Sequence, residues 1–355
     1  MSPLRLGKRL RRANAHPHQR RLSLEKLETR QVLATFVVTT NQDTVDADDG
    51  VVSLREAIAM ANSQAGEDRI EFDLGSDAAT TIRLDFGELT LTDAATIIGP
   101  GPALLTIDAQ QQSRIFDIAS TEGDYQFERL MLVNGAPSVP PFSWPPIPRS
   151  EVGGGAIRSI TTGNLALENC VFQHNVATEG GAVMAFGNVR LYSSTITGNT
   201  GESGTGGVYT QGSIAVNSTI ISDNASMALW EYSSAGGIRA RGDVTVIDST
   251  ISNNQGDFAS GISADGNIRL ERSSVTDNLF DAVAGRGRIE VEFSHIIGNA
   301  GAALGAAEVF VTTSMISDNG SAFYAADEFG TREKSLSSRA RSCETVQEST
   351  AAVSR

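Results

Sequence analysis

The amino-acid sequence predicts an all-β protein, a right-handed parallel β-helix with a short N-terminal capping helix. Three observations support this: a short phrase that recurs seven times and ends in asparagine, apolar columns within that phrase, and an amphipathic segment ahead of it. The asparagines are Asn175, Asn199, Asn224, Asn254, Asn278, Asn299 and Asn319. A repeat of roughly 20–50 residues indicates a solenoid, in which each unit buries its apolar face on its neighbours.

Each phrase has the pattern of two short strands. Apolar residues stand ten, eight and three positions before the asparagine, as Leu165, Leu167 and Phe172 do in the first phrase. A step of two places alternate side chains on one face of a strand, whereas the step between the two groups indicates a bend. Five positions before each asparagine stands a column of small residues: Cys170, Ser194, Thr219, Ser249, Ser273, Ser294 and Ser314.

The spacing of the asparagines, 20 to 30 residues, sets the kind of solenoid. A strand plus a crossover helix needs about 30 residues or more, so the period favours a coil of two or three strands joined by turns. A leucine-rich repeat is the main rival, but its leucine-dense pattern is absent. Successive coils would stack about 4.8 Å apart. We therefore expect the asparagines to form a ladder of side-chain amides, and the hydroxyl column to hydrogen-bond along the stack.

Glycine pairs recur between the phrases, for example Gly180–Gly181 and Gly236–Gly237. Glycine permits a positive φ or a close approach of two backbones, so we place these pairs at corners of the coil.

Ahead of the repeats, Ser53 and Glu56 have the spacing of a helix capping box. Leu54, Ala57 and Ile58 then line one face of a short amphipathic helix. Such a helix fits the end of a solenoid, because the first coil otherwise exposes its core and an unpaired strand edge.

The sequence divides into five parts. We expect a basic leader over 1–35, a cap with irregular first coils over 36–135, a proline-rich loop over 136–152, regular repeats over 153–326, and a disordered tail over 327–355. Trp144 at the tip of the loop either forms an external contact or folds back on the wall. Because the tail does not resemble a cap, we expect the chain to be a fragment or to carry an altered C-terminus; the alternative is assembly through an open last coil.

The basic leader contains a motif that resembles an export motif. Residues 24–34 (LEKLETRQVLA) resemble the L-E-x-L-E-P-R-x-L-L-A motif of many large exported proteins of planctomycete bacteria. Thr29 stands in place of the usual proline and Val32 in place of the first leucine. The resemblance implies export to the cell surface or outer membrane; the alternative is a basic disordered leader. The leader lacks the apolar core of a standard secretory signal.

Residues 36–135 resemble the CSLREA domain, which precedes β-helix repeats in predicted bacterial surface proteins. The matching segments are 53–58 (SLREAI), 68–72 (DRIEF), 97–101 (IIGPG) and 105–108 (LTID). Val52 replaces the cysteine that names the domain, so any role of that cysteine is lost. The later repeats are similar to those of polymorphic outer-membrane proteins and pectate-lyase-like β-helices. The resemblance implies an extracellular protein with an adhesive or structural role.

Charge and composition argue against binding of nucleic acids and against a membrane-spanning helix. The net charge is −14, although residues 1–30 are basic. An acidic solenoid is a poor nucleic-acid binder, because phosphate contacts need cations. No apolar run approaches the length of a membrane-spanning helix.

Catalytic motifs of related solenoids are not found. The calcium-binding acidic cluster with an arginine base of pectate lyases is absent, as are the GHG and RIK motifs of polygalacturonases. Asp223, Asp277 and Asp318 precede asparagines and read as turn residues. We expect Cys170 to pack inward, with His174 on the opposite face.

One loop is a candidate metal site. Asp43, Asp46, Asp48 and Asp49 place four carboxylates within seven residues, which fits oxygen ligation of calcium. The alternative is a solvated acidic loop, and no other cofactor is expected.

From these observations we expect a non-catalytic, exported β-helix with a structural or adhesive role, whose partner is a surface polysaccharide or another cell-surface protein. The alternatives are a β-helix polysaccharide lyase or glycoside hydrolase, or a carbohydrate-binding module. The fold itself is compatible with all of them.

Overall fold

The computed structural model describes residues 33–46, 48–76, 78–137, 151–227, 234–324 and 351–352 of the chain. By internal contacts the chain divides into Met1–Gln31 and Val32–Arg355. The leader motif, Trp144 and most of the tail lie outside the described residues, so our expectations for them stay predictions.

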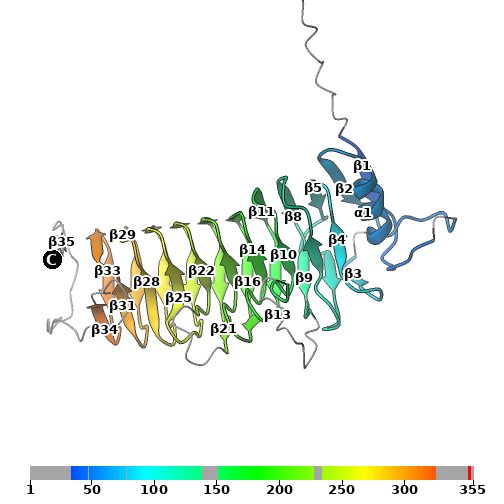
Figure 1. The fold of residues 1–355 in the computed structure, drawn as a ribbon. Coiled ribbons are helices and arrows are strands. Elements are labelled where there is room, and N and C mark those ends of the chain that lie inside the picture. Colours follow the sequence, from blue (N-terminus) through cyan, green and yellow to red (C-terminus); the bar gives the residue numbers. More distant parts are fainter. Residues whose placement is uncertain are drawn as a thin grey trace, which may run out of the picture. The chain divides into compact units, whose positions relative to one another are not determined.

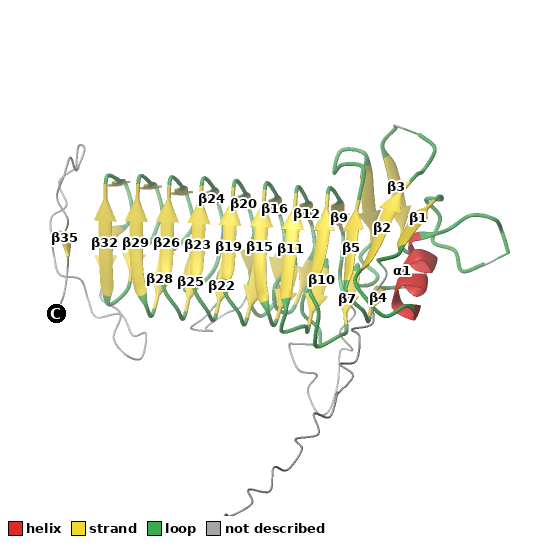
Figure 2. Cartoon of the chain, turned by 90° about the horizontal axis from the view of Figure 1, so that it is seen from above, coloured by secondary structure: helices red, strands yellow, loops and turns green. Residues whose placement is uncertain are grey.

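The predicted fold is confirmed. The described residues between Leu33 and Tyr324 form a right-handed parallel β-helix, whose coils stack side by side as shown in Figures 1 and 2. A complete coil contributes one strand to each of three sheets, which we call sheets A, B and C, and three coils add a strand to a small sheet D.

The strands of each sheet follow in spatial order. Sheet A contains β1 (Thr35–Val38), β2 (Asp68–Phe72), β5 (Ala95–Ile98), β8 (Tyr125–Glu128), β11 (Asn164–Glu168), β15 (Asn188–Tyr192), β19 (Ile214–Asn217), β23 (Val244–Ile247), β26 (Ile268–Glu271), β29 (Arg288–Glu292), β32 (Glu308–Thr312) and β35 (Ala351–Ala352). Sheet B contains β3 (Thr80–Arg83), β6 (Leu105–Asp108), β9 (Met131–Val133), β12 (Val171–Gln173), β16 (Thr195–Thr197), β20 (Ile220–Ser222), β24 (Thr250–Ser252), β27 (Ser274–Thr276), β30 (His295–Ile297) and β33 (Met315–Ser317). Sheet C contains β4 (Leu89–Leu91), β7 (Phe116–Ile118), β10 (Ile157–Ser159), β14 (Val183–Ala185), β18 (Val208–Thr210), β22 (Ile238–Ala240), β25 (Ala259–Ala264), β28 (Asp281–Gly285), β31 (Ala302–Gly305) and β34 (Ser321–Tyr324). Sheet D contains β13 (Val176–Ala177), β17 (Thr200–Gly201) and β21 (Ala225–Ser226). Only β35 pairs antiparallel among the described strands, on β32.

Like residues lie on like residues, because the register follows the repeat. Leu165 of β11 pairs with Val189 of β15, which pairs with Ile214 of β19. These side chains point inward and are almost fully buried, as is Phe172 of β12. The apolar columns of the sequence therefore form one continuous core.

The bends of the coil use left-handed backbone. The residues six positions before and one position before each ladder asparagine all have a φ between +47° and +72°. The first column is Asn169, Ser193, Ser218, Asp248, Arg272, Phe293 and Thr313, and the second is His174, Gly198, Asp223, Asn253, Asp277, Gly298 and Asp318. Asp223, Asp277 and Asp318 are thus turn residues. A left-handed residue other than glycine costs about 1–2 kcal/mol, so other interactions must hold these bends.

A second glycine column, which the sequence analysis did not identify, lies just before sheet A. A Cβ on Gly187 would lie 1.9 Å from the carbonyl oxygen of Gly163, and a Cβ on Gly212 would lie 2.7 Å from that of Gly187. At this corner the stacked backbones touch, so a side chain cannot be accommodated. The predicted glycine pairs show the same contact at Gly181, whose Cβ would lie 2.3 Å from the oxygen of Gly206.

Helix α1 (Leu54–Ser63) covers the N-terminal end of the core. Its buried side chains Leu54, Ala57, Ile58 and Ala61 pack into the same cluster as the first strands. Within the described ranges, no helix has the length and hydropathy needed to cross a membrane.

We predict that Gly187→Ala lowers the free energy of unfolding by about 1–3 kcal/mol, because the added methyl group overpacks a backbone contact. Gly285→Ala is the matched control, since its Cβ would meet first the flexible end of Ile268 at 3.1 Å. Urea denaturation of both variants measures the difference. Equal losses would show that the glycine column is not a close-contact column.

Candidate functional site

The seven repeat asparagines form a continuous ladder inside the solenoid. From Asn199 onward, Oδ1 of each asparagine accepts hydrogen bonds from both the backbone N–H and Nδ2 of the asparagine one coil earlier, at 2.8–3.1 Å. Oδ1 of Asn175 accepts from the N–H of Gly135 at 2.8 Å. Nδ2 also donates to a backbone carbonyl, as Asn199 does to Phe172 at 3.1 Å. The first six side chains are almost fully buried and Asn319 partly so. The side-chain amides of the ladder therefore pair with the buried backbone N–H and carbonyl groups of this bend.

A second ladder runs along the small-residue column at the other bend. The N–H of Cys170 donates to Oγ of Ser194 at 3.1 Å, and the N–H of Ser194 donates to Oγ1 of Thr219 at 3.2 Å. The same contact continues coil by coil to Ser314. Burial raises the pKa of the Cys170 thiol to about 12, so this thiol is not ionised at neutral pH and is a packing group.

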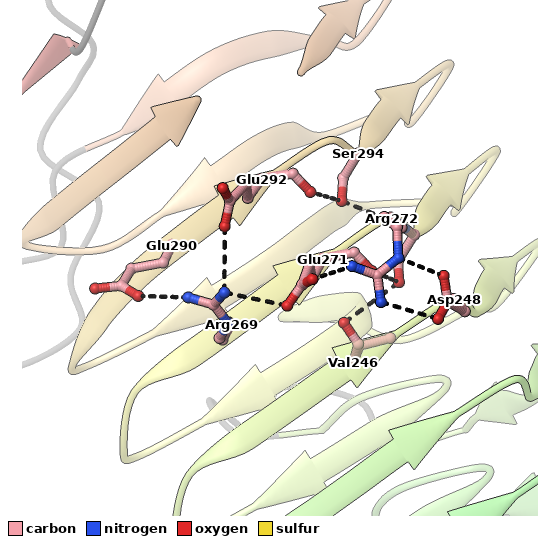
Figure 3. Close-up of polar contacts among 9 residues, drawn as sticks. Val246, Asp248, Arg269, Glu271, Arg272, Glu290, Glu292 and Ser294 are labelled. Carbon is pink, nitrogen blue, oxygen red and sulfur yellow. Dashed lines mark hydrogen bonds and ion pairs between the residues drawn. The ribbon is translucent and has the colours of Figure 1, made fainter. Parts of the chain in front are cut away.

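The outer face of sheet A carries a lattice of ion pairs on β26 and β29, drawn in Figure 3. Arg269 lies 3.1 Å from Glu271, 3.4 Å from Glu290 and 3.2 Å from Glu292. Arg272 binds both oxygens of Asp248, at 2.8 and 3.0 Å, and also pairs with Glu271. Hydrogen bonds from Arg272 lower the pKa of Asp248, and those from Arg269 and Arg272 lower the pKa of Glu271. These exposed pairs stabilise little individually, and they keep the carboxylates ionised.

A more buried cluster lies on sheet C. Arg158 of β10 binds both oxygens of Asp117 of β7, at 2.6 and 3.0 Å. Arg114 is 3% exposed, pairs with Glu88 at 2.7 Å, and donates to the carbonyls of Glu151, Gly153 and Gly154 at 2.9–3.1 Å. Burial lowers the pKa of the Arg114 guanidinium, and Glu88 and Asp117 offset part of that effect. Arg114 thus fastens the chain where it returns from the proline-rich loop.

The acidic loop near the cap, our candidate calcium site, directs its carboxylates to different partners. Asp43 has a side chain that is 1% exposed, and its oxygens bind Arg55 at 2.8 and 2.9 Å. Its Oδ2 also accepts from the N–H groups of Asp85 and Phe86, at 2.8 and 3.1 Å. Its neighbours instead make short-range backbone contacts: Asp46 accepts from the N–H of Asp48, and Asp49 from that of Val51. The four carboxylates do not converge, and the described residues hold no group of three or more His, Cys, Asp or Glu placed for a metal ion.

The capping box at the start of α1 also ties the acidic loop to the helix. Oγ of Ser53 accepts from the N–H of Glu56 at 3.1 Å, and Oε2 of Glu56 accepts from the N–H of Ser53 at 2.8 Å. Oε1 of Glu56 accepts from the N–H of Asp46 at 2.6 Å. Burial alone would raise the pKa of Glu56, but these hydrogen bonds bring it below its ordinary value.

The two histidines of the repeats do not form a shared site. His174 is exposed at a left-handed bend, while Cys170 points into the core. His295 is exposed on β30, five coils away from His174. Sequence reasoning missed two clamps, Asp43–Arg55 and Arg114–Glu88, because their partners come from separate segments. For the Asp43–Arg55 pair, the available signal in the sequence was that Arg55 lies within the SLREAI segment.

Comparison with known proteins gives fold likeness alone. No family model and no curated protein sequence matches the chain. The catalytic domain of a GH87 alpha-1,3-glucanase, solved in complex with tetrasaccharides, has 11% identity and a TM-score of 0.39, covering 83% of this chain and 67% of that one. The A-module of an Azotobacter vinelandii mannuronan C-5 epimerase has 14% identity and a TM-score of 0.36, covering 79% of this chain and 84% of that one.

We predict a position-dependent cost of cutting the asparagine ladder. Asn224→Ala leaves the buried backbone N–H of Asn199 without its acceptor and removes the amide donor to the carbonyl of Ile196, at roughly 1–3 kcal/mol for each group left unpaired. Asn319→Ala, at the partly exposed end of the ladder, is the control and is expected to cost less. Urea midpoints compare the two, and a larger loss at Asn319 would contradict a ladder that works by burial.

We also predict that calcium does not stabilise this protein. Asp43→Ala should destabilise it by about 3–5 kcal/mol, because Arg55 loses its partner in a largely buried site. Asp49→Ala should stay within about 0.5 kcal/mol, as expected for an exposed substitution. Thermal denaturation with and without millimolar calcium tests both statements. A calcium-dependent rise in the wild-type midpoint that is absent in Asp43→Ala would restore the metal hypothesis.

Proposed function

We propose that this chain is an exported, non-catalytic β-helix that acts as a structural or adhesive element at the cell surface, with a polysaccharide as partner. The observation that carries the proposal is how the polar side chains are used. The asparagine and hydroxyl ladders run along the stack, and the ion pairs of sheet A run across neighbouring coils. The polar groups therefore extend along the coils instead of converging on one point.

The surface location rests on the export-type motif in residues 24–34 and on the CSLREA-like cap. The capping helix and its Asp43–Arg55 clamp support a role as a rigid element, because they close the N-terminal end of the core where an open coil would fray. A rigid, acidic rod suits display outside the cell, where repulsion between like charges keeps molecules apart.

If the protein instead processes a polysaccharide, the candidate reactive groups are Asp117 and Arg158. Asp117 and Arg158 combine a carboxylate and an arginine on the outer face of sheet C. They bind each other in a bidentate pair, so a substrate would have to displace that pair. Glu88, the second carboxylate of this cluster, is itself paired with Arg114.

The test is adsorption of the full-length chain to a panel of neutral and anionic polysaccharides, with product release measured in the same wells. We expect adsorption without new reducing ends or unsaturated products. Product release that disappears in Asp117→Asn would overturn the non-catalytic proposal and place chemistry on sheet C. Failure to adsorb to any polysaccharide would overturn the adhesive role towards glycans.

A further inference from the structure

Over its seven repeat strands the outer face of sheet B is uncharged, whereas the earlier strands β3 and β6 place Arg83 and Asp108 at outward positions. Its side chains lie four and two positions before each ladder asparagine, on β12, β16, β20, β24, β27, β30 and β33. The first column is Val171, Thr195, Ile220, Thr250, Ser274, His295 and Met315, and the second is Gln173, Thr197, Ser222, Ser252, Thr276, Ile297 and Ser317. No position in either column is Asp, Glu, Lys or Arg. The outer face of sheet A, by contrast, carries the ion pairs described above.

Hydroxyl groups dominate the centre of this face. On β16, β20, β24 and β27, every outward position except Ile220 is Ser or Thr. Thr197 and Ser222 share a hydrogen bond of 3.2 Å. Thr250, Ser252, Ser274 and Thr276 are half-buried, and their side chains make no hydrogen bond among the residues that the structure describes. Each hydroxyl offers one donor and two acceptor sites, so these groups are available to a ligand.

The array is regular and held from beneath. Strands of a sheet lie about 4.8 Å apart, and outward side chains along one strand recur every ~6.6 Å. Between the two columns, Ile196, Ile221, Ile251 and Val275 are fully buried, and the two ladders fix the bends on either side. The hydroxyls are therefore preorganised, which lowers the entropic cost of binding.

The chemistry of the face selects the partner. A polyanion would find no Lys or Arg in the two columns of the repeat strands and would be repelled by a chain of net charge −14. A globular protein partner commonly buries about 800 Å² per side, with Trp, Tyr and Arg at the centre, and neither column contains any of these residues. A neutral polymer rich in hydroxyls can make the same contact at each coil, so that weak contacts add up.

We propose that the outer face of sheet B binds the surface of an uncharged, ordered polysaccharide, with rows of sugar hydroxyls lying across the Ser and Thr columns. This inference rests on the proposed adhesive function and names both the face and the class of glycan.

The test compares two lysine variants of the full-length chain. Thr250→Lys on β24 places an ammonium group in the centre of the face, where it would lose water without gaining a partner, so we expect adsorption to microcrystalline cellulose or chitin to fall at least about tenfold. Thr245→Lys on β23 places the same group in the same coil but on the outer face of sheet A, and is expected to change adsorption less than about twofold. Matching thermal midpoints verify folding, and Thr250→Val, which keeps the shape but removes a hydroxyl, gives a second variant.

The outcomes separate the two proposals. If the wild type adsorbs and Thr250→Lys adsorbs equally well, the face is not the site, while the adhesive function stands. Wild-type adsorption to alginate or pectate alone would overturn the neutral assignment. Enrichment of the wild type in growing ice, lost in Thr250→Lys, would show that the ordered partner is water and would also overturn the polysaccharide inference. No adsorption to any polysaccharide would overturn the adhesive function itself.

Discussion

The structure depends on supplying hydrogen bonds to buried backbone at the bends. Strands within the sheets pair through their own ladders, but a bend between two sheets turns N–H groups away from that pattern. A buried N–H without a partner is costly. The side chain of Asn199 provides Oδ1 to the N–H of Asn175, and Ser194 provides Oγ to the N–H of Cys170. Each coil therefore completes the bends of its neighbour, and the left-handed residues beside these positions are tolerated for that reason.

This constraint also explains the surface. Because the bends keep every coil in register, each outward position becomes a row along the stack. Sheet A acquires rows of Arg and Glu that pair across coils, and sheet B acquires rows of Ser and Thr. The glycine column beside Gly187 has the same origin, because stacked corners bring carbonyl oxygens to within 1.9 Å of where a Cβ would lie.

Periodic features could be predicted from the sequence, and features that join distant segments could not. The strands around Leu165 and Phe172 and the capping helix follow from local spacing. The link between Asp43 and Arg55 does not, because the carboxyl oxygens also accept from Asp85 and Phe86, some 40 residues away. The four carboxylates of the acidic loop show the same effect: they are close in sequence, but Asp43 binds Arg55 while Asp46 and Asp49 accept from nearby backbone N–H groups. The glycine column had a visible signal, because a glycine stands twelve positions before the asparagine in six of the seven phrases, but spacing alone does not reveal that two backbones touch.

Stacking favours some functions over others. Catalysis in a polysaccharide enzyme requires different groups brought to one point, such as an acid and a base at a set separation. In-register coils instead repeat similar groups about 4.8 Å apart, so convergence needs long turns or insertions that break the repeat. The described insertion ends, held by Arg114 through Glu151 and Gly153, are where this chain departs most from its period. Elsewhere the repeat yields rows, and a row is best matched by a partner that is itself periodic. The same hydrogen bonds that satisfy the bends thus give sheet B a surface suited to an ordered polymer.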